Sequence, residues 1–274
     1  CNAPYVSVII AVKDGANYIR DSVDSILLQE FENFEFIIID DGSTDTTLEI
    51  LKQYNDKRIR IYSQPNKGLA KSLNTVLRYC RVRFVHTSWM FRKELLDTVG
   101  FYSEDPNREP PEDYEFASRV SKKYAISNLP AVLVAYRETP KSISSLLRNT
   151  SVSREDKFRS NLAKISSENL AYYNNLPNDN ISCQLFGKLL HNPTNIDQDV
   201  SNQFQKIHSL IANAATEISL NFEKSDLQYL ASKYSQQIYL RIAQIQYAKS
   251  MKKTAYVKIR YAIKKFVISK LFIK

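Results

Sequence analysis

The chain has 274 residues, of which 43% are hydrophobic and 24% charged, a composition typical of a soluble globular protein that buries a sizeable core. No apolar stretch approaches the roughly 20 residues that cross a bilayer, so we expect no membrane-spanning helix. The formal net charge of +9 is uneven, because residues 227–274 contain eleven Lys or Arg and no Asp or Glu. The remainder has 27 basic against 29 acidic residues and is nearly neutral.

The cysteines and the N-terminus bear on the cellular compartment. Cys1, Cys80 and Cys183 are too scattered for a zinc site or a disulfide framework, which favours a reducing compartment. The first residues lack the charged region and apolar run of a signal peptide. We therefore expect a cytoplasmic protein.

Strands and helices are predicted to alternate over the first 80 residues. Residues 5–12 are a continuous apolar run typical of a parallel strand, and apolar spacing predicts a helix over residues 19–29. The same criteria predict a buried strand at 36–39, a helix from about residue 46, a strand over 58–63 and a helix over 69–77. This order indicates an α/β domain with a mostly parallel sheet flanked by helices.

Two adjacent carboxylates follow the second predicted strand, in residues 40–45, Asp-Asp-Gly-Ser-Thr-Asp. Ligands of open parallel sheets bind beyond the carboxyl ends of the strands, where Asp40 and Asp41 are expected to lie. Two such acids need hydrogen bonds from a ligand, backbone amides or a cation. The alternative is that they only cap a turn at Gly42 and the next helix. We favour a ligand site, because the complete pattern follows a strand.

Together with residues 6–14, Val-Ser-Val-Ile-Ile-Ala-Val-Lys-Asp, and residues 66–68, Asn-Lys-Gly, this pattern resembles the family 2 glycosyltransferases. The resemblance covers about the first half of the chain. It implies a GT-A-like (Rossmann-like) fold, a nucleoside-diphosphate sugar as donor, and inverting transfer to a saccharide or lipid-linked acceptor. Cell-surface polysaccharide or glycolipid synthesis is the process that such a reaction would serve.

The resemblance also implies a nucleotide site, formed by Ala11, Val12, Asp14, Asp40, Asp41, Lys67 and Gly68. Asp41 would accept hydrogen bonds from the uracil ring or the ribose, and Asp40 would support its turn. Lys67 is expected to reach a phosphate, with a solvated turn lysine as the alternative. Asp14 stands where the family usually has Asn.

The family's metal motif has no counterpart at the expected place. Family members have a strand ending in Asp-x-Asp, which holds Mg²⁺ or Mn²⁺ against the diphosphate. No acidic residue lies between Asn74 and His86, and the chain passes directly into a segment that resembles the acceptor side. We infer a gap of several dozen residues near 81–84. Asp197 and Asp199 form a literal Asp-x-Asp in a polar stretch, which we interpret as coincidental.

Glu112 and Asp113 follow two prolines and open a predicted helix with Tyr114, Ala117, Val120 and Ser121 on one side. In the family resemblance Asp113 is the general base and Glu112 its neighbour, since inverting transfer needs a carboxylate that takes the acceptor's proton. Ordinary helix-start signals are the alternative. Trp89 either lines the acceptor side or belongs to the core.

Beyond the catalytic region we predict a last strand at residues 129–136 and a helical extension. The domains are therefore expected at 1–145 and 146–274. The tail from Lys249 has the pattern of a basic amphipathic helix, which favours peripheral binding to anionic lipid at the inner face of the membrane. Docking on the protein itself is an alternative, and nucleic-acid binding is the least favoured.

The leading hypothesis is therefore a family 2-like hexosyltransferase. The rival hypothesis is a non-catalytic nucleotide-binding or scaffold protein, or a truncated fragment of such an enzyme. The two differ in the metal motif, whose absence puts the activity of this chain in doubt.

Overall fold

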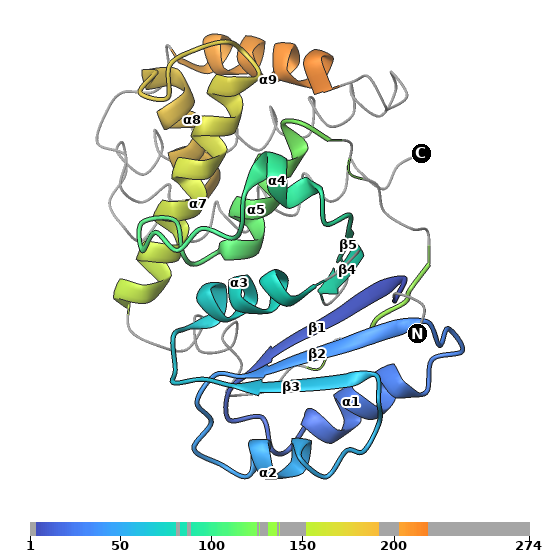
Figure 1. The fold of residues 1–274 in the computed structure, drawn as a ribbon. Helices are drawn as coiled ribbons and strands as arrows, with labels where there is room; N and C mark the ends of the chain where they lie inside the picture. The colour runs from blue at the N-terminus through green and yellow to red at the C-terminus, as the bar shows by residue number, and fades with distance from the viewer. Residues whose placement is uncertain are drawn as a thin grey trace, which may run out of the picture. The chain divides into compact units, whose positions relative to one another are not determined.

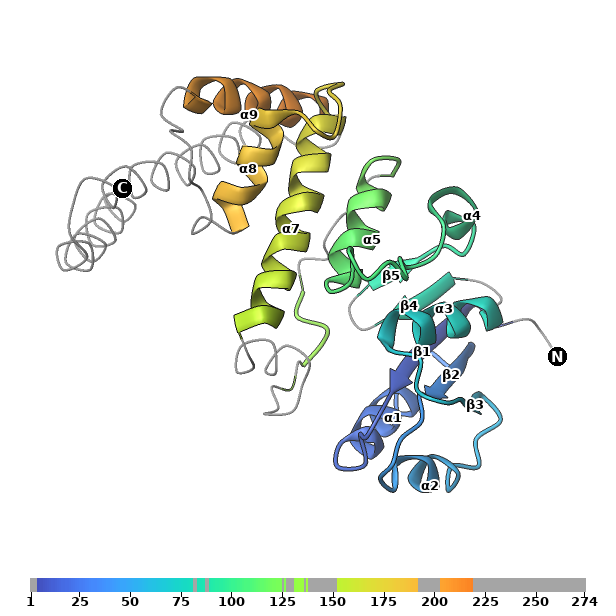
Figure 2. The ribbon, with the colours of Figure 1, turned by 90° about the vertical axis from the view of Figure 1, so that its left-hand side faces the viewer.

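The computed structural model describes residues 4–80, 83–86, 89–124, 126, 131–135, 137, 152–191 and 203–218. The chain divides into two compact units, Cys1–Ser145 and Leu146–Lys274. Figures 1 and 2 show the helices and strands of each unit from two directions.

The first unit is built on a five-stranded sheet of order β3-β2-β1-β4-β5 (Figure 1). Its strands are β1 Val6–Val12, β2 Phe34–Asp40, β3 Ile59–Ser63, β4 Arg83–His86 and β5 Trp89–Phe91. The first four run parallel, and β5 is antiparallel to β4. The predicted mostly parallel sheet is thus confirmed.

Helices cover both faces of this sheet. They are α1 Ile19–Leu27, α2 Thr47–Leu51, α3 Leu69–Tyr79, α4 Leu95–Val99 and α5 Glu112–Ser121. In β2, Phe36 and Ile38 pack into the core shared with α1 and α2, whereas Ile37 and Ile39 pack into the core shared with α3 and α5. Burial on both faces explains why β2 is continuously apolar rather than alternating.

The second unit contains three described helices, α7 Val152–Tyr172, α8 Ile181–His191 and α9 Phe204–Ile218 (Figure 2). Their apolar faces share one buried cluster, which includes Leu170, Leu189 and Ile207. Helices α7 and α8 lie in close contact at Gly187, where a Cβ atom would lie 2.0 Å from the carbonyl oxygen of Ala163. None of the described helices is long and apolar enough to cross a membrane.

Two details differ from the prediction. Residues 131–135 are not a strand, and Val132 is 97% exposed, so the predicted last strand is wrong over these residues. Helix α2 ends at Leu51, although apolar spacing continues to Tyr54. At the inferred gap, β4 follows α3 within a few residues and pairs directly with β1. The amphipathic tail and the Asp197–Asp199 match lie outside the described residues.

Candidate functional site

Asp41 lies directly after β2 and holds the turn that follows β3. Its backbone N–H donates to the carbonyl of Val12, at 2.8 Å. Its carboxylate accepts hydrogen bonds from Gln64 Nε2 at 2.8 Å, from the N–H of Lys67 at 2.9 Å and from the N–H of Gly68 at 3.0 Å. Asp41 therefore joins the ends of β1 and β2 to the start of α3.

Asp41 is 5% exposed. Burial raises its pKa, but hydrogen bonds from Gln64, Lys67, Ser72 and Gly68 together outweigh burial and hold the pKa below the ordinary value. Asp41 is therefore ionised at neutral pH. A carboxylate has about four lone-pair positions, and the bonds from Gln64, Lys67, Gly68 and Ser72 occupy them. A ligand at Asp41 would share or replace one of these bonds.

Gly42 allows the loop after β2 to pack against the same turn. Its φ is +71°, a left-handed conformation that favours glycine. A Cβ atom at Gly42 would lie 2.7 Å from the backbone nitrogen of Asn66, so any larger residue would displace the turn. The side chain of Asn66 in turn accepts a hydrogen bond from the N–H of Gly68, at 3.2 Å.

Asp40 is the last residue of β2. Its carboxylate accepts hydrogen bonds from the N–H of Ser43 at 3.3 Å and from the hydroxyl of Ser63 at 3.1 Å, and the residue is 2% exposed. These contacts match the capping alternative for Asp40. Because Ser63 ends β3, Asp40 also ties the ends of β2 and β3 together.

The loop after β1 is fastened to the loop after β2. Asp14 has a φ of +51°, which Asn and Asp adopt more readily than most residues. Its carboxylate accepts from the N–H of Thr44 at 2.7 Å, and its own N–H donates to Ser43 Oγ at 2.9 Å. The next two amides donate to Thr47 Oγ1 at 2.8 Å and to Asp45 Oδ2 at 3.1 Å. The two loops therefore form one interlocked edge.

All seven predicted nucleotide residues lie at the carboxyl ends of β1, β2 and β3 or in the adjoining turns. Ala11 and Val12 are half-buried and pair in register with Ile39 and Asp40. The side chain of Lys67 is exposed. Gln64 also belongs to this edge but was not predicted, because a single Gln after a strand carries no sequence signal.

Glu112 and Asp113 form the first turn of α5. Asp113 is exposed and its carboxylate accepts from the N–H of Tyr114 at 2.6 Å. Glu112 is half-buried; burial raises its pKa, as do the charges of Asp113 and Glu109, and its own backbone N–H opposes them. Glu112 therefore holds a proton at higher pH than an ordinary Glu.

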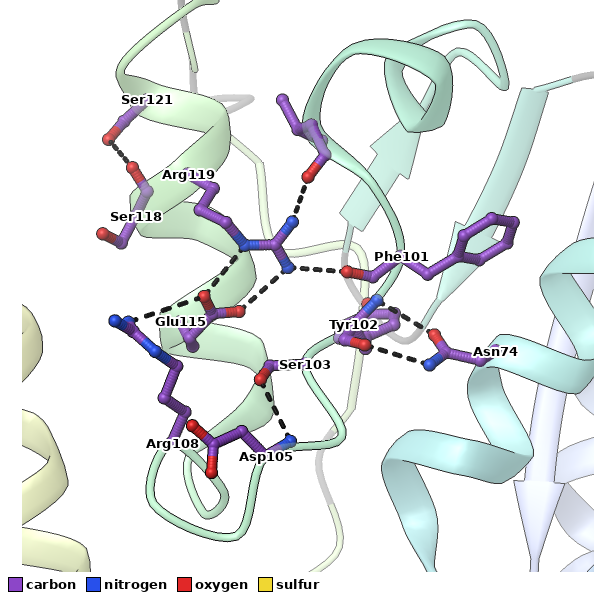
Figure 3. Close-up of polar contacts among 11 residues, drawn as sticks. Asn74, Phe101, Tyr102, Ser103, Asp105, Arg108, Glu115, Ser118, Arg119 and Ser121 are labelled. Atoms are coloured by element: carbon purple, nitrogen blue, oxygen red, sulfur yellow. Dashed lines mark hydrogen bonds and ion pairs between the residues drawn. The ribbon is translucent and has the colours of Figure 1, made fainter.

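The buried face of α5 contains an ion pair. Tyr114 is 38% exposed, whereas Glu115 is 3% exposed and accepts from Nε and Nη2 of Arg119, both at 2.9 Å (Figure 3). Arg119 also donates to the carbonyls of Val99 and Phe101, the latter at 2.7 Å. This ion pair fastens α5 to the segment that follows α4, and helical spacing alone did not predict it.

Asn74, which is 2% exposed in α3, binds the same segment from the other side (Figure 3). Its Nδ2 donates to the carbonyl of Tyr102 at 3.0 Å and to Glu104 Oε1 at 2.8 Å. Its Oδ1 accepts from the N–H of Tyr102 at 2.9 Å. Asn74 was also not predicted, because its partners lie about 30 residues away in the sequence.

Trp89 in β5 is half-buried and packs against the core. Its ring lies 5.4 Å from that of Phe91, which lies 5.4 Å from Phe116, and Phe116 stacks on Tyr102 at 4.5 Å. These contacts support the core alternative for Trp89. The acceptor role stays a prediction.

Within the described ranges, no group of three or more His, Cys, Asp or Glu side chains is arranged to hold a metal ion. The Mg²⁺ or Mn²⁺ of the family pattern would need one or two carboxylates beside the diphosphate, and the described residues contain no Asp-x-Asp.

Residues 7–98 match the family model described as glycosyl transferase family 2. An uncharacterized glycosyltransferase of Haemophilus influenzae is 47% identical over 76 residues, 27% of this chain and 24% of that protein. Chondroitin synthase of Escherichia coli is 44% identical over 80 residues, 28% of this chain and 12% of that protein. The chain thus spans about a quarter or less of these relatives' length.

Two solved structures are similar at low sequence identity. One is TarS 1-349 of S. aureus, with a TM-score of 0.47 and 16% identity over 91% of this chain and 93% of that chain. The other is the mannosyltransferase PcManGT from Pyrobaculum calidifontis in complex with GDP-Man and Mn²⁺, with a TM-score of 0.48 and 15% identity over 97% of this chain and 81% of that chain.

Proposed function

Because residues 7–98 belong to glycosyl transferase family 2, we propose that this protein transfers a sugar from a nucleoside-diphosphate sugar to a saccharide or lipid-linked hydroxyl, with inversion. Cell-surface polysaccharide or glycolipid synthesis is the process that we propose for it. Curated relatives named chondroitin synthase and hyaluronan synthase support the polysaccharide class.

One observation supports the proposal most directly. Asp41 forms hydrogen bonds that connect the carboxyl ends of β1 and β2 with the turn after β3. A rigid edge at the carboxyl ends of parallel strands is the usual position of a nucleotide in such sheets. We propose that Ala11 and Val12 flank the base and that Asp41 accepts one hydrogen bond from the base or ribose. The exposed ammonium of Lys67 provides a cation for the diphosphate.

In the proposed reaction the acceptor hydroxyl attacks the anomeric carbon as the bond to the diphosphate breaks. Asp113, exposed at the start of α5, takes the hydroxyl proton, so that the neutral glycoside is released together with the nucleoside diphosphate. Glu112 orients this carboxylate. Because its pKa is raised, Glu112 is also the residue that can replace Asp113 as the base.

The negative charge on the leaving diphosphate limits this reaction. In metal-dependent transfer a cation stabilises that charge by several kcal/mol. We propose that Lys67 and the exposed Arg92 stabilise part of this negative charge in place of a metal ion. We therefore propose slow transfer by the polypeptide as written, with little response to Mg²⁺ or Mn²⁺.

A second candidate function is nucleotide binding without catalysis. It is favoured by the direct passage from α3 to β4, which leaves out an Asp-x-Asp segment. A scaffold of this kind would bind UDP or GDP but would not release a nucleotide from a nucleotide sugar. We further propose a cytoplasmic protein whose basic tail, residues 249–274, rests on anionic lipid.

A matched pair of lysine variants tests the donor site. Lys67 and Lys71 are both exposed, one in the turn held by Asp41 and one in the first turn of α3. Lys67→Ala should weaken UDP or GDP binding about tenfold or more in calorimetry, as expected for the loss of one charge-assisted phosphate contact. Lys71→Ala should leave affinity unchanged. Equal affinities for both variants and the parent would remove Lys67 from the site.

A further inference from the structure

We propose that Asn74 and Arg119 are positioning residues for the Glu112–Asp113 carboxylates and act through the segment 99–104. This inference rests on the proposed function, in which these carboxylates receive the acceptor's proton. Neither residue is assigned contact with a substrate. Their role is to fix the segment against which α5 begins.

The first attachment comes from α3. Asn74 uses both halves of its amide on Tyr102: Nδ2 donates to the carbonyl at 3.0 Å and Oδ1 accepts from the N–H at 2.9 Å. A third bond, at 2.8 Å, reaches Glu104 Oε1. A side-chain amide that pairs with both backbone groups of one residue fixes its position and direction. Because Asn74 is buried, water replaces these bonds poorly.

The second attachment comes from α5 itself. Arg119 is one turn after Glu115, and the two form a bidentate ion pair. The same guanidinium donates to the carbonyls of Val99 and Phe101 (Figure 3). Arg119 therefore uses its planar, multiple donors to bridge the helix and the segment, and Lys, as a single point charge, could not reproduce this geometry.

Between these two attachments, the ring of Tyr102 stacks on Phe116 of α5 at 4.5 Å. Both rings are almost fully buried. Residues 99–104 are thus held by α3 on one side and by α5 on the other. The first turn of α5, which carries Glu112 and Asp113, is therefore fixed relative to α3.

The same region is electrostatically linked to the carboxylates. Burial raises the pKa of the Tyr102 phenol, and the charges of Asp113 and Glu112 raise it further, while Arg119 opposes them. The Tyr102 side chain therefore lies within the field of both carboxylates. A shift of the segment would change the surroundings of Glu112 directly.

Helix α3 also carries the donor side. Its N-cap is Gly68, whose N–H donates to Asp41, and Asn74 lies six residues further along the same helix. One rigid helix thus connects the turn of the proposed nucleotide site with the segment that supports the proposed base. Asn74→Ala removes the bonds to the segment and leaves the bond from Gly68 to Asp41 in place, so it should change proton transfer without changing donor affinity.

The test compares Asn74→Ala and Arg119→Lys with the parent and with Arg58→Lys. Arg58 is a matched control, because it forms an ion pair with Asp56 at 2.8 Å in the same unit, before β3. The pKa of Glu112 is measured in nucleotide-free protein by following the ¹³C NMR signal of its side-chain carboxyl with pH. The signal is assigned by its absence in Glu112→Gln. Both test variants should move the pKa of Glu112 toward its ordinary value, and Arg58→Lys should not.

In the pH titration, the groups that act on Glu112 are Asp113 and Glu109, together with its burial. Tyr102 and Arg119 belong to the same electrostatic cluster. Glu104 is exposed, and Glu104→Gln weakens only one of the Asn74 hydrogen bonds. This milder variant can be measured even if Asn74→Ala does not fold. It should produce a smaller shift in the same direction.

Where transfer is measurable, Asn74→Ala should lower kcat by about 100-fold, the loss expected for a misplacement of about 1 Å, while the Kd of UDP or GDP stays constant. An unchanged Glu112 titration in folded Asn74→Ala, Arg119→Lys and Glu104→Gln would overturn the inference and leave these residues a stabilising role only. Failure of the parent to bind any nucleotide would instead overturn the proposed function, and the titration would still decide the inference.

Discussion

Replacing Asp41 by Ala tests, in ligand-free protein, whether this carboxylate stabilises the turn that follows β3. The substitution removes three hydrogen bonds to a charged acceptor and leaves the N–H groups of Lys67 and Gly68 without it. Hydrogen bonds to charged groups contribute about 1.5–3 kcal/mol each, and water at this partly exposed turn recovers part of that. We expect the free energy of unfolding to fall by about 3 kcal/mol.

The assay is urea unfolding followed by the fluorescence of Trp89, the single tryptophan. The control is Asp21→Ala, whose side chain is 65% exposed and pairs with Arg137, and which should cost about 0–1 kcal/mol. Because the pKa of Asp41 is lowered in the folded protein, its contribution is present above the unfolded pKa and is lost as pH falls through the folded pKa. The difference between parent and Asp41→Ala should therefore shrink in acid. Equal stability of Asp41→Ala and Asp21→Ala at neutral pH would refute the turn-holding role.

Three further results are expected. Asp113→Asn should reduce sugar transfer by a factor of about 100 or more without loss of donor binding, measured by nucleotide release; full activity would exclude it as the base. Removal of residues 249–274 should release the protein from anionic vesicles, and binding of the full chain should weaken with salt; salt-independent binding would contradict the lipid-surface role. Gly187→Ala should lower the melting temperature of the helical unit, because its Cβ would lie 2.0 Å from a backbone oxygen; an unchanged melting temperature would mean that α7 and α8 separate freely.

The sheet could be predicted because its strands carry their signal locally. The apolar run of β2 is buried on both faces, so every residue from Phe36 to Ile39 contributes to the pattern. The position of Asp40 and Asp41 at the carboxyl edge of the sheet could be predicted as well, because it follows from strand direction alone. Both inferences needed only the order of residues along one segment.

The supporting contacts could not be predicted in the same way. Asn74 and Arg119 bind backbone groups 18 to 28 residues away, and which groups they reach depends on how the helices pack. The apolar residues near Val132 suggested a strand, but a strand also needs a neighbour with which to pair, and local sequence does not supply one. The sequence indicated a ligand contact for Asp41 but not its hydrogen bond from Gln64. These two side chains meet only because β2 and β3 pair in the sheet.

The most direct test of the central claim is calorimetric titration of the 274-residue protein with UDP and with GDP, in EDTA and then in Mg²⁺ or Mn²⁺. The site around Asp41 and Lys67 predicts that one of the two nucleotides binds in EDTA and that the divalent cations change its affinity little, because the described residues contain no Asp-x-Asp to hold a cation on the diphosphate. Absence of binding under every condition would contradict the nucleotide site. Binding that appears only with Mg²⁺ or Mn²⁺ would contradict the metal-independent donor site proposed for this chain.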